Sequence, residues 1–102
     1  MKTKKLKVPA HLSAEAKRLW RSTVESYAID EQAAMILTAA LEALDRRNEA
    51  RQEIARGGAV VKDRFGQQKV SPWCAIERDS ALSLYRAFRL LGMDLSQAGV
   101  TK

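Results

Sequence analysis

The side chains that most often carry out acid–base, nucleophilic or metal chemistry are scarce in this sequence. There is one histidine, His11, and one cysteine, Cys74, and they lie far apart in the chain. His11 has no carboxylate or nucleophile as an evident partner in the sequence, and a single cysteine supports neither an intramolecular disulfide nor a zinc knuckle. We therefore expect His11 to be a surface residue near a helix start and Cys74 to be a small core residue.

The acidic residues and the glycines also fail to outline a catalytic site. Most Asp and Glu residues alternate with Arg at helical spacing, which is typical of charge pairing on a solvated helix face. Gly57-Gly58 is followed by valines and lacks the Lys and Ser/Thr of a phosphate-binding loop. We therefore predict that the chain is not an enzyme, that it has no catalytic residues, and that it binds no cofactor and no metal.

Basic residues gather at the start of the chain. The chain has 102 residues and a formal net charge of +6, and a large part of this charge belongs to a short arm that contains no acid. A basic arm on a nearly neutral body suits a polyanionic partner, and nucleic acid is the default partner of this kind. The alternative is that these lysines are only solvated and keep the chain soluble. The lysines of the arm are Lys2, Lys4, Lys5 and Lys7.

A second basic cluster, Lys17, Arg18 and Arg21, follows within the first predicted helix. The arm and this cluster are close enough in the chain to contact one stretch of phosphate backbone. Such contacts position a protein on DNA and make its affinity depend on salt, but they do not read the base sequence. Arg86 and Arg89 form a third and weaker basic patch, for which the alternative is simple surface arginines.

The spacing of apolar residues predicts three helices that must position these side chains. Ser13 is a suitable cap for a first helix whose apolar residues recur every three or four positions up to Tyr27. Asp30 caps a second helix, which runs to Arg56 and ends at Gly57-Gly58. Ser71-Pro72 starts a third helix, which ends at Gly92.

Between the second and third helices, residues 59–70 read as a short β-hairpin. Val60 and Val61 are β-branched, and Phe65-Gly66 supplies a turn. The predicted fold class is therefore mainly α, with three helices, a long central helix, and a hairpin between helices two and three. We expect a basic arm at residues 1–9, a single domain at 10–92 and a loose tail at 93–102.

The second helix is apolar on nearly all sides from Ala33 to Leu44. A helix of this kind is buried on several sides or against other subunits. It is also about as long as a small domain is wide, so we expect other copies of the chain to cover part of it. This predicts a homo-oligomer larger than a dimer, with an interface formed by Ile36, Leu37, Leu41 and Leu44.

The order of these features resembles that of phage terminase small subunits. The similarity spans roughly residues 9–92, and its individual motifs are weak while their order and spacing give the signal. Met93-Asp94-Leu95-Ser96 departs from the ending that is usual in the family. The matching pieces are Leu12-Ser13-Ala14-Glu15-Ala16 with Trp20, Gly57 to Val61, Gly66, Ser71-Pro72, and Leu90-Leu91-Gly92.

The resemblance implies a role that the residue pattern alone does not give. Proteins of this family recognise viral DNA, deliver it to a separate large subunit that holds the ATPase and nuclease, and often assemble into rings. For this chain it implies double-stranded DNA, the terminase large subunit and other copies of itself as partners. The expected location is the cytoplasm of the bacterial host.

Two other classes of function remain open from the sequence. A small helical DNA-binding transcriptional regulator would need a base-reading helix, and the start of the second helix offers only Gln32 for that task. A pure protein–protein adaptor would leave the lysine arm without a role. Membrane association is not expected, because no stretch is apolar over the length that a membrane span requires and no apolar run follows the basic start.

Overall fold

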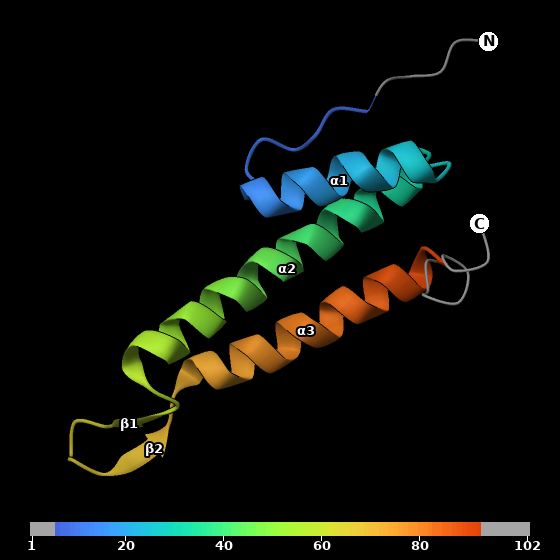
Figure 1. The fold of residues 1–102 in the computed structure, drawn as a ribbon. Helices are drawn as coiled ribbons and strands as arrows, with labels where there is room; N and C mark the ends of the chain where they lie inside the picture. Colours follow the sequence, from blue (N-terminus) through green and yellow to red (C-terminus); the bar gives the residue numbers. More distant parts are fainter. Residues whose placement is uncertain (1–5, 93–102) are drawn as a thin grey trace.

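The computed structural model describes residues 6–92, which form three α-helices and one two-stranded antiparallel sheet (Figure 1). This is the mainly α architecture predicted from the sequence, with a long central helix and a hairpin before the third helix. None of the helices in this part of the chain is long and apolar enough to cross a membrane. The elements are α1 (Ala14–Ser26), α2 (Glu31–Gly57), β1 (Val60–Lys62), β2 (Gln68–Val70) and α3 (Pro72–Leu90).

Each helix begins at the capping residue that the sequence predicts. Ser13 Oγ accepts a hydrogen bond from the amide of Ala16 at 3.1 Å, and Asp30 Oδ1 accepts one from Ala33 at 2.8 Å. Ser71 Oγ accepts from the amide of Trp73 at 3.2 Å. These contacts satisfy amides that have no partner inside their own helix, which is why these residue types mark the helix starts.

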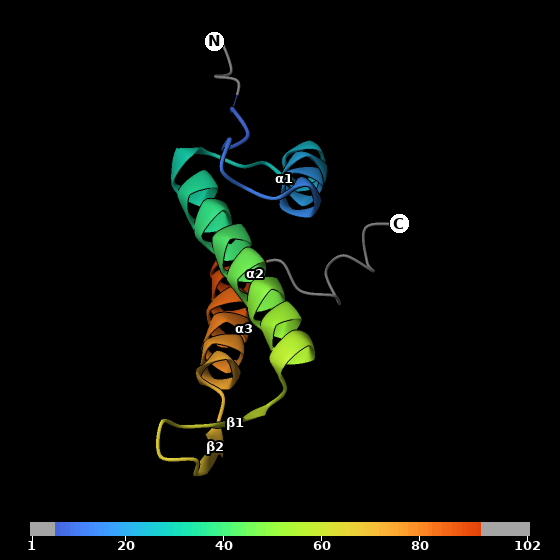
Figure 2. The ribbon, with the colours of Figure 1, turned by 90° about the vertical axis from the view of Figure 1, so that its left-hand side faces the viewer.

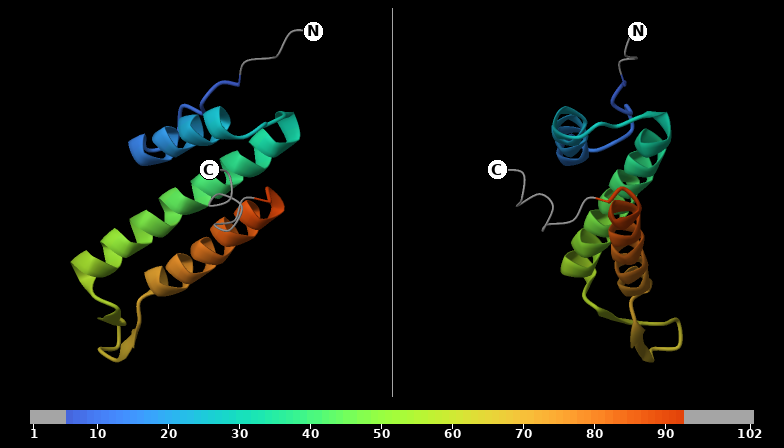
Figure 3. Two further views of the ribbon diagram at one scale, coloured as in Figure 1. Left: turned by 45° about the vertical axis from the view of Figure 1, so that its right-hand side comes forward. Right: turned by 90° about the vertical axis from the view of Figure 1, so that its right-hand side faces the viewer.

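Helix α2 is covered from two sides. Helix α3 runs back antiparallel along one side of it, and α1 crosses the N-terminal half of α2 on another side (Figures 1 and 2). The hairpin lies beyond the far end of α2, away from α1, in every view (Figure 3). Two neighbouring helices therefore account for the nearly continuous apolar character of α2, without a second copy of the chain.

Three of the four residues of the predicted oligomer interface are buried within the single chain. Leu37 and Leu41 are 0% exposed and Leu44 is 6% exposed within the single chain. The sequence predicts more apolar surface on α2 than the rest of the chain can cover, whereas in the structure α1 and α3 cover these side chains. Only Ile36 of the predicted set remains half-buried at the edge of the core.

Small side chains allow the three helices to pack closely. Half of the buried hydrophobic residues are alanines, and Ser80 takes a similar place on α3. A small residue at a helix contact lets the larger Trp20, Leu37 and Leu41 fill the remaining space, which is needed for close packing of the interior. The buried alanines are Ala16, Ala34, Ala40, Ala43, Ala50 and Ala87.

Three polar pairs fasten the start of α1 to the middle of α2. The first members of successive pairs are two positions apart in the chain, and their partners on α2 are three positions apart. Each pair therefore lies about one helical turn further along α2 than the pair before it. His11 thus has a carboxylate partner, which the sequence analysis did not find. The pairs are His11 Nε2 with Glu42 Oε2 at 2.7 Å, Ser13 with Asp45 at 2.6 and 2.9 Å, and Asn48 Nδ2 with Glu15 Oε1 at 3.1 Å.

Candidate nucleic-acid interface

The basic arm is only partly described by the structure. Lys2, Lys4 and Lys5 lie outside the described residues. Lys7 is exposed in the segment that leads to α1, while its neighbours Leu6 and Val8 pack against the core cluster. Apolar anchoring on both sides of Lys7 holds this part of the arm close to the body of the protein.

The predicted basic cluster of α1 faces away from the core. Ala16 and Trp20 form the buried face of α1, whereas Arg18 and Arg21 are exposed and Lys17 is half-buried. Within residues 6–92 no ion pair joins any of these three cations to a carboxylate. Their positive charge is therefore available to an external anion.

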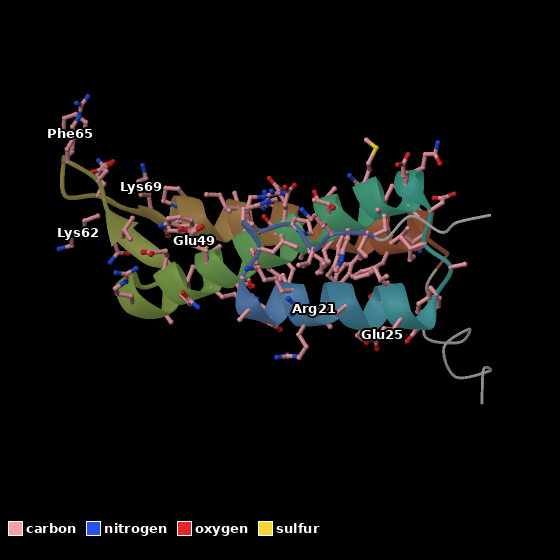
Figure 4. All side chains as sticks on the ribbon, turned by 90° about the horizontal axis from the view of Figure 1, so that it is seen from above. Arg21, Glu25, Glu49, Lys62, Phe65 and Lys69 are labelled. Carbon is pink, nitrogen blue, oxygen red and sulfur yellow. The ribbon has the colours of Figure 1, made fainter. Side chains whose placement is uncertain are left out.

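Glu25 limits the basic face formed by Lys17, Arg18 and Arg21 at its C-terminal end. Arg21 and Glu25 are directed to the same side of α1 (Figure 4). They are four positions apart, which is one helical turn, so Glu25 weakens the positive potential beyond Arg21. The Glu15 carboxylate at the other end is occupied by its hydrogen bond from Asn48. The basic face is thus confined to the stretch from Lys17 to Arg21.

The β-hairpin carries a second basic surface that the sequence analysis missed. Val60 pairs with Val70, Val61 with Lys69, and Lys62 with Gln68. Residues 64–66 form the loop, in which Gly66 donates to the carbonyl of Asp63 at 3.0 Å and has a positive φ of 80°. A glycine in this conformation after a tight turn is typical of a three-residue hairpin loop. The exposed cations of the hairpin are Lys62, Arg64 and Lys69.

The single acid of the hairpin is used inside the loop. Asp63 Oδ1 accepts hydrogen bonds from the amides of Phe65 at 2.8 Å and Gln67 at 3.0 Å. Its carboxylate therefore stabilises the turn, as Asp side chains often do. A signal for this surface was present in the sequence, because residues 62–69 contain three cations and one acid beside an aromatic turn residue.

The arginines of α3 lie elsewhere. Arg86 and Arg89 are exposed on the last turns of this helix. Arg86 borders an open apolar hollow between α2 and α3, to which Ile36 and Leu90 also contribute. A guanidinium beside apolar side chains is more typical of a protein contact than of a continuous phosphate-binding surface, so these arginines are set apart from the two basic surfaces above.

At its start, helix α2 exposes Gln32 as the one side chain suited to reading bases. Its first turns expose Glu31, Gln32 and Met35. A carboxylate at this place would face phosphate oxygens of the same charge, and Met35 has no hydrogen-bonding group for a base edge. The described residues also contain no group of three His, Cys, Asp or Glu side chains placed to hold a metal ion.

Comparison of the chain with protein-family models, with curated proteins and with solved structures gives no match. The function is therefore inferred from the residues of the chain and from their arrangement.

Proposed function

We propose that this chain is a non-enzymatic DNA-packaging adaptor of the terminase small subunit kind. It binds double-stranded viral DNA and delivers it to a separate large subunit with ATPase and nuclease activity. The observation that carries the proposal is the basic face of α1. Its Arg18 and Arg21 are exposed, have no carboxylate partner within residues 6–92, and face away from the core.

The fold suits contact with a phosphate backbone. The polar pairs that join the start of α1 to α2 hold the helix that carries the cations in a fixed orientation. Lys7 precedes them in a segment that is itself anchored on the core. Preorganised cations lose less freedom on binding than a free lysine run does, which favours affinity for a regular array of phosphates.

The proposal includes association of several copies, through a different surface from the one predicted. Met35 is 73% exposed and Leu90 is 74% exposed, and both border the apolar hollow together with Ile36 and Ala39. Large apolar side chains gathered in one exposed place are typical of a protein contact. A second copy that covers this surface would remove Met35 and Leu90 from water.

Native mass measurement of the full chain, with and without duplex DNA, tests the proposal. An adaptor of this kind gives an assembly larger than a dimer and a further mass shift on adding duplex, and the shift weakens as salt is raised. A transcriptional regulator would give a dimer that prefers one DNA sequence. A pure protein–protein adaptor would show no retention of DNA even at low salt, and this result would remove the proposal.

A further inference from the structure

The β-hairpin extends beyond the end of the helices and is the part of the described chain farthest from α1 (Figures 1 and 2). Four of the six strand residues are on the face that carries Val60 and Lys62, because paired residues of an antiparallel sheet point to the same side. Val60 is 56% exposed and Val70 is 65% exposed, so this face is not covered by the helices. This face of the β-hairpin is therefore accessible to a partner molecule.

The tip of the hairpin exposes an aromatic ring between cations. Phe65 is 75% exposed, and the guanidinium carbon of Arg64 lies 5.1 Å from the centroid of its ring. Lys62 and Lys69 extend from the two strands behind the tip, as Figure 4 shows. A phenylalanine in a loop position that usually takes a small polar residue leaves its apolar surface in water unless a partner covers it.

The charge of this surface is fixed by the turn. The Asp63 carboxylate accepts hydrogen bonds from two backbone amides of the loop. It is therefore directed into the turn and does not pair with the neighbouring cations. Within residues 6–92 no carboxylate forms an ion pair with Lys62, Arg64 or Lys69. The hairpin therefore presents unpaired positive charge around one exposed ring.

We propose that the hairpin is a second DNA-contacting element, which places Phe65 in a groove of duplex DNA while the flanking cations contact phosphates. This inference rests on the proposed function. A narrow antiparallel ribbon is an element that a DNA groove can admit, and apolar side chains at the tip of such elements can enter between base steps and unstack them. With α1 beside the N-terminal half of α2 and the hairpin beyond its C-terminal end, the chain has two separate contacts for nucleic acid.

The test compares two hairpin variants of the full chain with matched controls, using duplex DNA that carries 2-aminopurine. Phe65→Ala is matched with Tyr85→Ala, which removes another aromatic side chain that is 60% exposed. The triple variant Lys62→Ala, Arg64→Ala, Lys69→Ala is compared with Arg46→Ala, Arg51→Ala, Arg78→Ala. This control removes the same formal charge from exposed sites on α2 and α3, where Arg51 pairs with Glu77 and Arg78 with Asp79. Circular dichroism and thermal unfolding verify that each variant is folded.

The hairpin contact predicts a separate effect for each variant. Phe65→Ala lowers affinity about ten-fold, because a stacking contact is lost, and abolishes the 2-aminopurine fluorescence increase at an unchanged salt slope. The hairpin triple variant lowers the slope of log affinity against log salt by about 2–3 units. Tyr85→Ala leaves the fluorescence increase intact, and the control triple variant has the smaller effect on slope.

Two outcomes would overturn the inference, and they are distinguishable. If the full chain binds duplex with a salt-dependent affinity, but Phe65→Ala behaves like Tyr85→Ala and the hairpin triple variant behaves like its control, the hairpin is not a DNA contact and the proposed function stands. If the full chain retains no duplex at low salt, the proposed function fails, and the hairpin contact fails with it.

Discussion

Ser13 donates two hydrogen bonds to the carboxylate of Asp45, one from its hydroxyl to Oδ1 at 2.6 Å and one from its amide to Oδ2 at 2.9 Å. The same hydroxyl accepts from the amide of Ala16. One side chain thus caps α1 and also joins it to α2, although the two partners are 32 residues apart in the chain. The orientation of the basic face of α1 depends on this contact as well as on the burial of Trp20.

We predict that Ser13→Ala destabilises the protein by about 1–2 kcal/mol, because it removes a helix cap and a bond to a charged group. Urea unfolding followed by circular dichroism measures this change. Ser22→Ala is the matched control, since Ser22 is exposed in the middle of α1, and it should have little effect. In a double-mutant cycle, Ser13→Ala and Asp45→Ala should be coupled by more than about 0.5 kcal/mol, and additive effects would contradict the shared contact.

We predict that Leu41→Ala lowers the free energy of unfolding by about 2–5 kcal/mol, as expected for a cavity in a core that collapses only partly. Leu41 is 0% exposed within one chain, so the effect should not depend on protein concentration. Urea unfolding at two protein concentrations makes this comparison. A concentration-dependent loss would instead indicate that Leu41 lies between copies, as the sequence alone had suggested.

Much of the fold could be predicted because its signals are local. Ser13, Asp30 and Ser71 each satisfy amides within the next three residues, so the sequence around them determines where the helices start. The hairpin between residues 59 and 70 was also predictable from β-branched residues around Phe65-Gly66.

The packing of these elements could not be predicted in the same way. Leu37 and Leu41 read as surplus apolar surface because the sequence does not reveal that α1 and α3 cover α2 from two sides. The hydrogen bond between His11 and Glu42 joins residues 31 positions apart. Spacing within a single helix predicts only pairs three or four positions apart, so it could not identify this contact. The sequence does not show that the hairpin cations are unpaired, because this depends on the Asp63 carboxylate accepting hydrogen bonds from amides of the loop.

We predict that the double variant Met35→Ser, Leu90→Ser reduces the assembly to a smaller mass while the fold of each chain is kept. Both side chains are more than 70% exposed, so the polar replacements do not disturb the core. Native mass spectrometry measures the assembly, with Leu82→Ser as a control at another exposed apolar position of α3. If the double variant keeps the mass of the full assembly while Leu82→Ser reduces it, the contact between copies lies on another surface.

We predict that removal of the lysine arm reduces the salt dependence of DNA binding. If Lys2, Lys4, Lys5 and Lys7 each contact one phosphate, a chain that begins at Val8 should have a slope of log affinity against log salt that is lower by about 3–4 units. The loss should be similar for unrelated DNA sequences, because phosphate contacts do not discriminate between bases. Fluorescence anisotropy with two duplexes over a range of salt concentrations measures both effects.

Changing Lys17, Arg18 and Arg21 to Ala in the shortened chain should weaken binding further, because the basic face of α1 then loses the cations that face solvent. The fold should persist, since Ala16 and Trp20 form the buried face of this helix. The matched variant changes Arg86 and Arg89 of α3 to Ala. If the arm and α1 variants keep the slope of the full chain while the α3 variant lowers it, the lysines serve only solubility and DNA meets α3 instead.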